Sequence, residues 1–435
     1  MAVSIGIMGE HKAGEHRIPL TPSQLKEIQD ENPSIQFIIQ PSAQRIFKEE
    51  EFTSLGLRIN MDLSDCPLVL AVKEIDVADI HPGKAYLYFS HTIKAQPYNM
   101  AMLKHILDVG ATLLDYELIK DDSSRRLVFF GRHAGLAGMI NSLWSYGQRL
   151  AAEGVDSPFG NVKQANGYAD LAAAKAEIRE ALSNVNDWLG DGGPLVVGIT
   201  GYGNVSKGAQ EILDLVPHTE ISPRELLSID AKRYRGQVLK VVFKESDLVR
   251  PTDSGAAFDL QEYYDHPERY ESSFDAVLPH LDILVNCIYW EERYPRLVTK
   301  ARLRELFKRD ARLKVIGDIT CDIEGSVECN LKATHSDDPV YVYLPEEDRI
   351  EMGFTGKGPV VMAVDNLPTE LPREASHDFG EALRPFVAPM GTADFSKPLA
   401  ELELPSEIKR AIIAHQGELV PEFEYLAEEV QQEAK

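Results

Sequence analysis

Four basic residues in the first quarter of the chain follow apolar runs that have the length of buried strands. Arg17 lies in the loop after the first run, Lys73 directly follows a later one, and His91 and Lys94 follow the next. Ligands of open α/β sheets bind beyond the carboxyl ends of strands, so these positions favour chemistry. Burial and cationic neighbours lower the pKa of a lysine until it acts as a base near neutral pH, where histidine already titrates. The set predicts an acid–base site for a carboxylate-rich substrate, although each residue alone would be an ordinary surface charge.

A glycine-rich run, Gly201-Tyr202-Gly203-Asn204-Val205-Ser206, follows the continuous apolar stretch Leu195–Thr200. Helical periodicity resumes after it, so the run joins a buried strand to a helix. Gly201 permits the tight turn, Gly203 lets the backbone approach a pyrophosphate, and Ser206 is small enough for close helix–strand packing. This context predicts a dinucleotide-binding turn.

The residues that follow the first helix after this turn bear on the choice of cofactor. A short strand is expected to end near Thr219–Ser222, where an acid would bind the ribose 2′-hydroxyl of NAD. Ser222 and Arg224 stand there instead, which suits the 2′-phosphate of NADP. Glu220 is the acidic alternative if the strand ends sooner. NADP is therefore the favoured cofactor, with NAD as the alternative.

Composition excludes several classes of partner. The formal net charge of −24 disfavours nucleic acid and anionic membranes, which need clustered Lys and Arg. The four cysteines form no C-x-x-C pair and no His-rich tract accompanies them, so we expect no metal. No signal peptide is evident, and no run approaches the roughly 20 apolar residues that span a bilayer. We expect a cytoplasmic protein with small-molecule substrates.

Apolar runs alternate with helical stretches, which predicts an α/β fold with mostly parallel sheets. Thr21-Pro22-Ser23-Gln24 has the pattern of a helical capping box, and Ala134–Gly154 that of one long helix. We expect two Rossmann-like domains flanking a cleft: a discontinuous substrate domain, 1–135 plus 345–435, and an NAD(P)-binding domain, 136–344. The expected strands are Val3–Met8, Ile35–Ile39, Leu68–Val72, Ala85–Phe89, Thr112–Tyr116, Arg126–Phe130, Leu195–Thr200, Ile283–Ile288, Lys314–Asp318 and Val360–Val364, and the tail beyond Ser376 is expected to be helical.

Several long motifs carry a family resemblance: Phe89–Gln96, Phe130–Ile140, Gly201–Gln210, Tyr263–Tyr270 and Asp365–Ser376. With them the chain resembles the lysine–ketoglutarate reductase portion of α-aminoadipic semialdehyde synthase, and more distantly the lysine-forming saccharopine dehydrogenases. Both are similar in fold to alanine dehydrogenase and transhydrogenase. The resemblance implies a saccharopine dehydrogenase (NADP, L-lysine-forming), which reversibly condenses L-lysine with 2-oxoglutarate and reduces the imine to saccharopine.

The resemblance also assigns roles to residues. It implies an acid–base pair, Lys73 and His91. The positions that it implies for substrate are Arg17, Lys94, Gln96 and Phe130. Those that it implies near the nicotinamide are Arg126 and Asp318, in addition to the cofactor residues Gly201, Gly203, Asn204, Val205, Ser206, Ser222 and Arg224.

Alternatives remain open at this stage. The synthase continues into a second enzyme that releases glutamate, so either this chain works with a separate glutamate-forming saccharopine dehydrogenase or it is one half of a longer product. The rival functions are an alanine-dehydrogenase-like enzyme, an NAD-linked lysine-forming saccharopine dehydrogenase, and a non-catalytic sensor of lysine or NADP.

Overall fold

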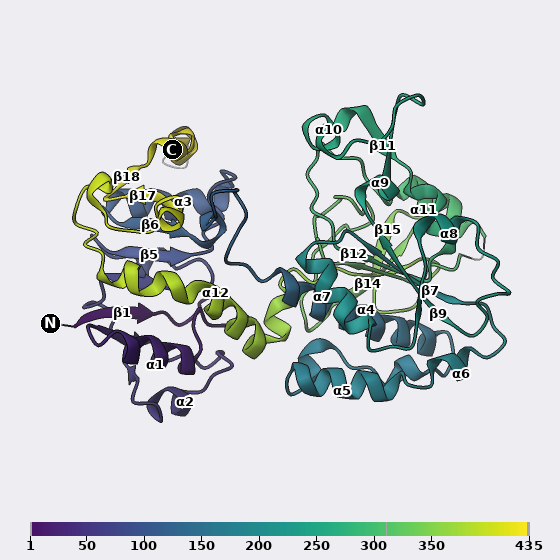
Figure 1. Cartoon of the computed structure of the whole chain (residues 1–435), viewed down its shortest axis with the longest axis horizontal. Coiled ribbons are helices and arrows are strands. Elements are labelled where there is room, and N and C mark those ends of the chain that lie inside the picture. The colour runs from purple at the N-terminus through teal and green to yellow at the C-terminus, as the bar shows by residue number, and fades with distance from the viewer. Residues whose placement is uncertain (1, 310, 433–435) are drawn as a thin grey trace. The chain divides into compact units, whose positions relative to one another are not determined.

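Two eight-stranded sheets organise residues 2–309 and 311–432, which the computed structural model describes (Figure 1). One sheet belongs to a unit formed by Met1–Phe130 and Pro372–Lys435, and the other to a unit formed by Gly131–Leu371. The predicted α/β class with mostly parallel sheets is confirmed, and the first unit is discontinuous. The chain leaves the second unit at Leu371 and not at 344, because the strands between residues 340 and 362 complete the second sheet.

The first sheet has six parallel strands in the order β3-β2-β1-β4-β5-β6, with β17 and β18 added antiparallel beyond β6. The parallel strands are mostly short apolar runs, as expected for a sheet covered on both faces. Their bounds are β1 Val3–Ile7, β2 Ile35–Ile39, β3 Arg58–Ile59, β4 Leu68–Leu70, β5 Ala85–Tyr88, β6 Thr112–Asp115, β17 Ile412–His415 and β18 Glu418–Leu419.

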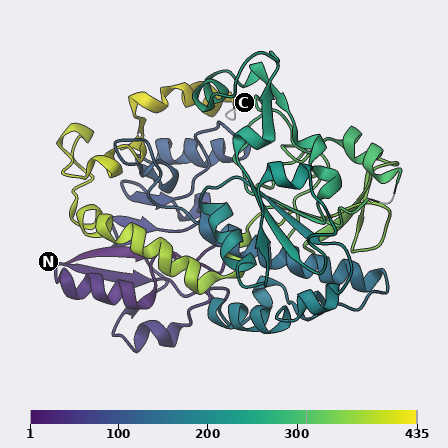
Figure 2. The same ribbon diagram turned by 45° about the vertical axis from the view of Figure 1, so that its right-hand side comes forward.

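Helix α1 (Pro22–Glu31) begins at the predicted capping box: Thr21 Oγ1 accepts from the Gln24 N–H, and Gln24 Oε1 accepts from the Thr21 N–H. Helix α12 (Pro372–Thr392) packs beside α1 against β1 and β2 (Figure 2). The two helices approach closely because Gly380 lacks a side chain; its Cβ would lie 2.1 Å from Gln24 Oε1. The other helices of this unit are α2 Glu49–Thr53, α3 Pro97–Asp108, α13 Ser406–Lys409 and α14 Ala427–Gln432.

Two expected elements of the first unit are wrong. Arg126–Phe130 is not a strand, since Arg126 forms only an isolated bridge with Lys120. The tail is not wholly helical, because the buried run Ile412–His415 forms β17 at the edge of β6. That pairing joins segments about three hundred residues apart, which local periodicity does not reveal.

The second sheet repeats the plan of the first, with six parallel strands in the order β8-β9-β7-β12-β13-β16 and two antiparallel strands, β14 and β15, beyond β16. The strand after β7 in sequence is β8, yet β7 pairs with β9. The bounds are β7 Leu195–Thr200, β8 Thr219–Glu220, β9 Val238–Phe243, β12 Ile283–Asn286, β13 Val315–Asp318, β14 Val340–Leu344, β15 Arg349–Met352 and β16 Val360–Met362.

Helix α4 (Gly131–Ala152) crosses α7 (Asn204–Leu213) with backbones nearly in contact (Figure 1). A Cβ on Gly135 would lie 1.8 Å from the Val205 carbonyl oxygen, and one on Gly208 would lie 2.0 Å from that of Arg132. Glycine at both positions therefore sets the distance between the helices. The remaining elements are α5 Leu171–Ala181, α6 Val185–Leu189, α8 Pro223–Leu227, α9 Glu245–Leu248, α10 Leu260–Asp265, α11 Lys300–Phe307 and the antiparallel pair β10 Val249–Pro251 and β11 Tyr270–Ser272.

Within the described residues, no helix combines the length and apolar character needed to cross a membrane.

Candidate active site

Lys73 lies three residues beyond the end of β4 and is held there through its backbone. Glu10, in the loop after β1, accepts the N–H of Val72 at 2.6 Å and that of Lys73 at 2.9 Å. Because β1 and β4 are neighbours in the sheet, an acid in the loop after β1 reaches the chain after β4. Glu10 was not predicted from the sequence, although it follows an apolar run, as Lys73 does.

Burial and charge alter the protonation of both residues. Burial, and then the positive charges of Arg17 and Lys12, lower the pKa of the Lys73 amine. Burial of the Glu10 carboxyl, and then the negative charge of Glu15, raise its pKa to about 8. The lowered pKa of Lys73 favours a neutral amine that accepts protons.

His91 lies after β5 in a left-handed conformation, with a φ of 50°. Its Nδ1 donates to Glu74 Oε1 at 2.5 Å, and its ring stacks near Phe89 with an interplanar angle of 17°. Burial would raise the pKa of Glu74, but the hydrogen bond and charge of His91 outweigh it and the pKa is lowered. The bond leaves Nε2 as the ring atom for acid–base chemistry. The neighbouring strands β4 and β5 thus deliver Lys73 and His91 to the same edge of the sheet.

A buried acid at the end of β6 anchors the loop that carries His91. Asp115 Oδ2 accepts from the Ser90 N–H at 2.9 Å and from the Ser90 hydroxyl at 2.5 Å. The Ser90 hydroxyl also lies 2.8 Å from that of Thr92. Burial raises the pKa of Asp115. Asp115 was not predicted from the sequence, where only the cations after these strands pointed to a site.

Arg17 is only 2% exposed, and its guanidinium forms a bidentate pair with Glu15, at 2.7 and 2.5 Å. The guanidinium carbon also lies 4.0 Å from the centroid of the Phe130 ring. Phe130 in turn stacks on Phe379, with centroids 4.3 Å apart. The structure therefore packs two predicted substrate residues, Arg17 and Phe130, against each other and gives Arg17 a carboxylate partner from its own loop.

The remaining predicted residues of this unit lie nearer the surface. Lys94 is exposed, and Gln96 is the half-buried N-cap residue of α3. Arg126, predicted near the nicotinamide, pairs with Glu117 at 3.4 Å.

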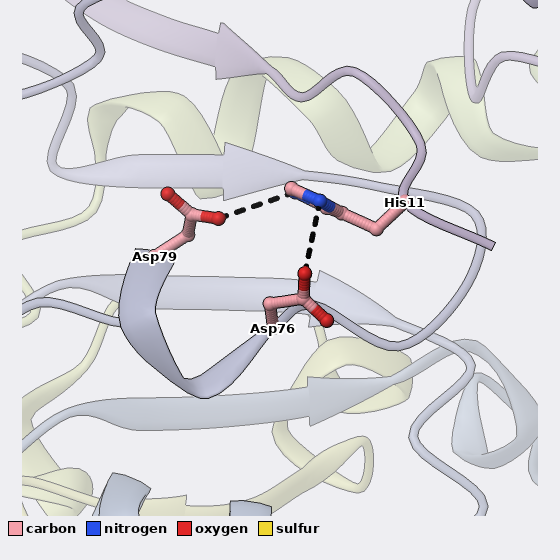
Figure 3. Close-up of side chains that lie close together, drawn as sticks. All are labelled: His11, Asp76 and Asp79. Atoms are coloured by element: carbon pink, nitrogen blue, oxygen red, sulfur yellow. Dashed lines mark ion pairs between the residues drawn. The ribbon is translucent and has the colours of Figure 1, made fainter.

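His11 joins two loops at the same edge of the first sheet. Its Nδ1 lies 3.1 Å from Asp76 Oδ2 and its Nε2 lies 3.3 Å from Asp79 Oδ2 (Figure 3). The three residues have the types that ligate metals. The two carboxylates approach different nitrogens of one ring, so the contacts act as a bridge between the loops after β1 and β4.

The glycine turn of the second unit has the geometry that a pyrophosphate requires. Gly201 has a φ of 82°, and its N–H donates to the Phe243 carbonyl at 2.8 Å. Helix α7 begins at Asn204, with Gly203 as its N-cap, and a Cβ on Gly203 would meet nothing within 4 Å. Ser206 is fully buried, as close packing requires. The residues present therefore fit the pyrophosphate of a nicotinamide dinucleotide, which Gly203 and the N–H groups of Asn204 and Val205 would hold.

Asp318, predicted near the cofactor, is 1% exposed and lies inside a polar network. Its two oxygens accept from Asn286 Nδ2 and Asn330 Nδ2, each at 2.8 Å, while Thr200 donates to Asn286 at 2.7 Å. Burial raises the pKa of Asp318 to about 6. The network ties together the carboxyl ends of β7, β12 and β13, so Asp318 supports the edge of the sheet from within.

Ser222 and Arg224, predicted to contact the ribose, follow the edge strand β8. Ser222 caps α8 by accepting from the Glu225 N–H, and Arg224 is exposed. The strand expected near Thr219–Ser222 is present, but it pairs with β9 and not with β7. These residues thus lie one strand farther from the glycine turn than predicted.

Family models match both parts of the chain. Residues 6–137 match "Alanine dehydrogenase/PNT, N-terminal domain", and residues 228–422 match "Alanine dehydrogenase/PNT, C-terminal domain". The chain resembles the structure of an L-alanine dehydrogenase over 98% of this chain and 100% of that one, with a TM-score of 0.63 and 17% identity. It resembles a transhydrogenase from Sinorhizobium meliloti over 97% and 100%, with a TM-score of 0.54 and 13% identity. Both likenesses establish the fold.

Curated relatives are closer in sequence. The chain is 39% identical over 447 residues to the alpha-aminoadipic semialdehyde synthase of Arabidopsis thaliana, covering 97% of this chain and 41% of the relative. It is 35% identical to the mitochondrial enzyme of that name from Bos taurus, covering 95% and 46%. It is 27% identical to the saccharopine dehydrogenase [NAD(+), L-lysine-forming] of Emericella nidulans, covering 88% and 90%.

The chain spans less than half the length of these synthases but nearly all of the fungal enzyme. The resemblance predicted from the sequence motifs is confirmed. The chain belongs to the alanine dehydrogenase/PNT family, and nearly all of it aligns with less than half of each aminoadipic semialdehyde synthase.

Proposed function

We propose that this chain catalyses the reductive condensation of L-lysine with 2-oxoglutarate to saccharopine, with NADP(H) as the preferred cofactor. The observation that carries the proposal is the lowered pKa of Lys73 at the sheet edge that also holds the His91–Glu74 pair. The alignment with aminoadipic semialdehyde synthases over 97% of this chain supports lysine as the amine. The dinucleotide turn at Gly201–Ser206 supports a nicotinamide cofactor.

The reaction needs protons moved at defined steps. Neutral Lys73 accepts a proton from the ε-ammonium of the substrate lysine, whose free amine then attacks the keto carbon of 2-oxoglutarate. Protonated His91 donates from Nε2 to the carbinolamine hydroxyl, which leaves as water as the imine forms. When bound, the nicotinamide supplies the hydride that reduces the imine carbon. Glu74 holds the His91 ring through Nδ1 and stabilises its charged form during this transfer.

The positive charges that Arg17 and Lys94 bring to this edge suit substrates with several carboxylates. Lys94 is exposed and Gln96 is half-buried at the start of α3, so both side chains are available to substrate. Arg17 is paired with Glu15, and we propose that it contributes positive charge to the site. To contact a substrate carboxylate directly, Arg17 would have to exchange Glu15 for that carboxylate.

Steady-state turnover tests the proposal. Purified protein with lysine, 2-oxoglutarate and NADPH is expected to oxidise the reduced cofactor, and omission of either carbon substrate is expected to abolish the rate. Oxidation with ammonia and pyruvate in place of lysine and 2-oxoglutarate would contradict the proposal and indicate an alanine-dehydrogenase activity. Binding of lysine and NADPH without any turnover would contradict it in favour of a sensor.

A further inference from the structure

The strand beside the glycine-turn strand is β9. All six residues of β7 pair with β9 in register, from Leu195 with Val238 to Thr200 with Phe243. Strand β8 precedes β9 in sequence but lies outside it, paired through Thr219 and Glu220. The segment 221–237 returns the chain from the edge of the sheet to its interior. The next strand after β7 in the sequence is therefore β8, whereas the next strand beside β7 in the sheet is β9.

In a dinucleotide-binding sheet, the residue after the strand adjacent to the glycine turn lies at the adenosine ribose and distinguishes its 2′-substituent. After β9 this position is Lys244, followed by Glu245. The hydrogen bond from the Gly201 N–H to the Phe243 carbonyl fixes Lys244 directly beside the turn.

The two charged groups after β9 differ in their partners. Glu245 accepts from the Tyr264 hydroxyl at 3.0 Å and hydrogen-bonds to Tyr202, whose pKa is raised chiefly by the Glu245 charge. Tyr264 belongs to α10 and Tyr202 to the glycine turn, so the Glu245 carboxylate is already engaged by two tyrosine hydroxyls. Helix α10 lies in the segment between β9 and β12 (Figure 1).

The Lys244 ammonium lies 5.8 Å from the centroid of the ring of the same Tyr202, and Lys244 is exposed. No carboxylate of the described residues pairs with this ammonium. The charge available at the ribose position is therefore positive. An ammonium suits a phosphate dianion, whereas a ribose diol is bound best by an acid.

The charges on the edge strand are placed differently. Glu220 lies 3.3 Å from the Lys240 ammonium, which also donates to Asp214 at 2.8 Å. Arg224 is the second residue of the short helix beyond this strand, about 5 Å farther across the sheet, the spacing of one strand.

We propose that Lys244 recognises the 2′-phosphate of NADP(H) and thereby selects this cofactor over NAD(H). The inference rests on the proposed function only in that a nicotinamide dinucleotide binds at Gly201–Ser206. Tyr202, under the ammonium, keeps the Lys244 side chain at the mouth of the turn through a cation–π contact.

Binding of the reduced cofactors, followed by their fluorescence without carbon substrates, tests the proposal independently of turnover. Lys244→Gln is expected to raise the dissociation constant for NADPH at least about tenfold, the scale of losing a hydrogen bond to a charged group, and that for NADH less than about twofold. Lys244→Arg is expected to retain preference for NADPH. Lys232→Gln, a matched change of an exposed lysine, is expected to alter neither constant.

Arg224→Gln and Glu245→Gln separate the competing assignments. A larger loss of NADPH binding in Arg224→Gln than in Lys244→Gln would overturn the proposal in favour of the edge-strand position. If Glu245→Gln weakens NADH binding and Lys244→Gln does not alter the binding of either cofactor, the proposal would be overturned in favour of an acidic ribose ligand. Equal losses of both cofactors in Lys244→Gln would overturn it as well. Wild-type preference for NADPH without turnover of lysine would defeat only the proposed function.

Discussion

Glu10 accepts the backbone N–H of Lys73 at 2.9 Å while its other oxygen accepts that of Val72 at 2.6 Å. One carboxyl group from the loop after β1 thus satisfies two consecutive donors after β4, at the point where the chain presents Lys73, the proposed base. The same carboxyl has a pKa of about 8, so the segment that positions Lys73 contains a group that titrates near physiological pH.

This titration predicts a pH dependence of stability. Burial of the carboxyl, and then the Glu15 charge, raise the pKa of Glu10 from 4.5 to about 8, so the unfolded chain releases the proton first as pH rises. The free energy of unfolding contributed by Glu10 is therefore highest at low pH and falls between about pH 4.5 and 8, by at most about 1.4 kcal/mol per pH unit. Glu10→Gln is expected to remove this decline. Urea unfolding of both proteins from pH 5 to 9 checks it, and parallel curves would contradict it.

Loss of the acid–base pair is expected to affect rate and not cofactor binding. The double variant Lys73→Met, His91→Gln should lose at least about 10²-fold in the rate of NADPH oxidation, the usual contribution of acid–base groups. The glycine turn lies in the other unit, so the dissociation constant for NADPH should stay within about twofold. Full activity of the variant would refute the assigned roles. Lys104→Met, an exposed-face lysine of α3 paired with Asp108, is a matched control.

The open space at Gly203 predicts a variant that separates folding from cofactor binding. A Cβ at Gly203 meets no protein atom within 4 Å, and the φ of −74° suits any residue, so Gly203→Ala should leave the free energy of unfolding nearly unchanged. The same methyl group would occupy the approach of the pyrophosphate and weaken NADPH and NADH alike, about tenfold or more. Titration of both cofactors checks this. Gly193→Ala, equally open but in a distant turn, should bind normally.

Local features were predictable from the sequence. The capping box at Thr21 and Gln24 depends on residues three apart, and the apolar run Leu195–Thr200 followed by glycines forms the expected strand and turn. The position of Lys73 and His91 after neighbouring strands followed from the same patterns.

Features set by distant pairing were not predictable. β17 depends on a free edge of β6, and the insertion of β9 between β7 and β8 depends on the whole sheet. Local patterns therefore directed attention to Arg224, after β8, and not to Lys244, after β9. The acids that hold the segments around Lys73 and His91 were also not predicted. Glu10 acts through backbone groups of another strand, and Asp115 acts on Ser90 from a third.

Isotopic analysis of the product tests the central claim most directly. The protein would be incubated with lysine carrying ¹⁵N at the ε position, unlabelled 2-oxoglutarate and NADPH deuterated at the transferable hydride. We predict a single product with the mass of saccharopine that carries both labels, with deuterium at the former keto carbon and ¹⁵N in the secondary amine. A product without ¹⁵N, such as glutamate or another amino acid formed with free ammonia, would contradict the claim.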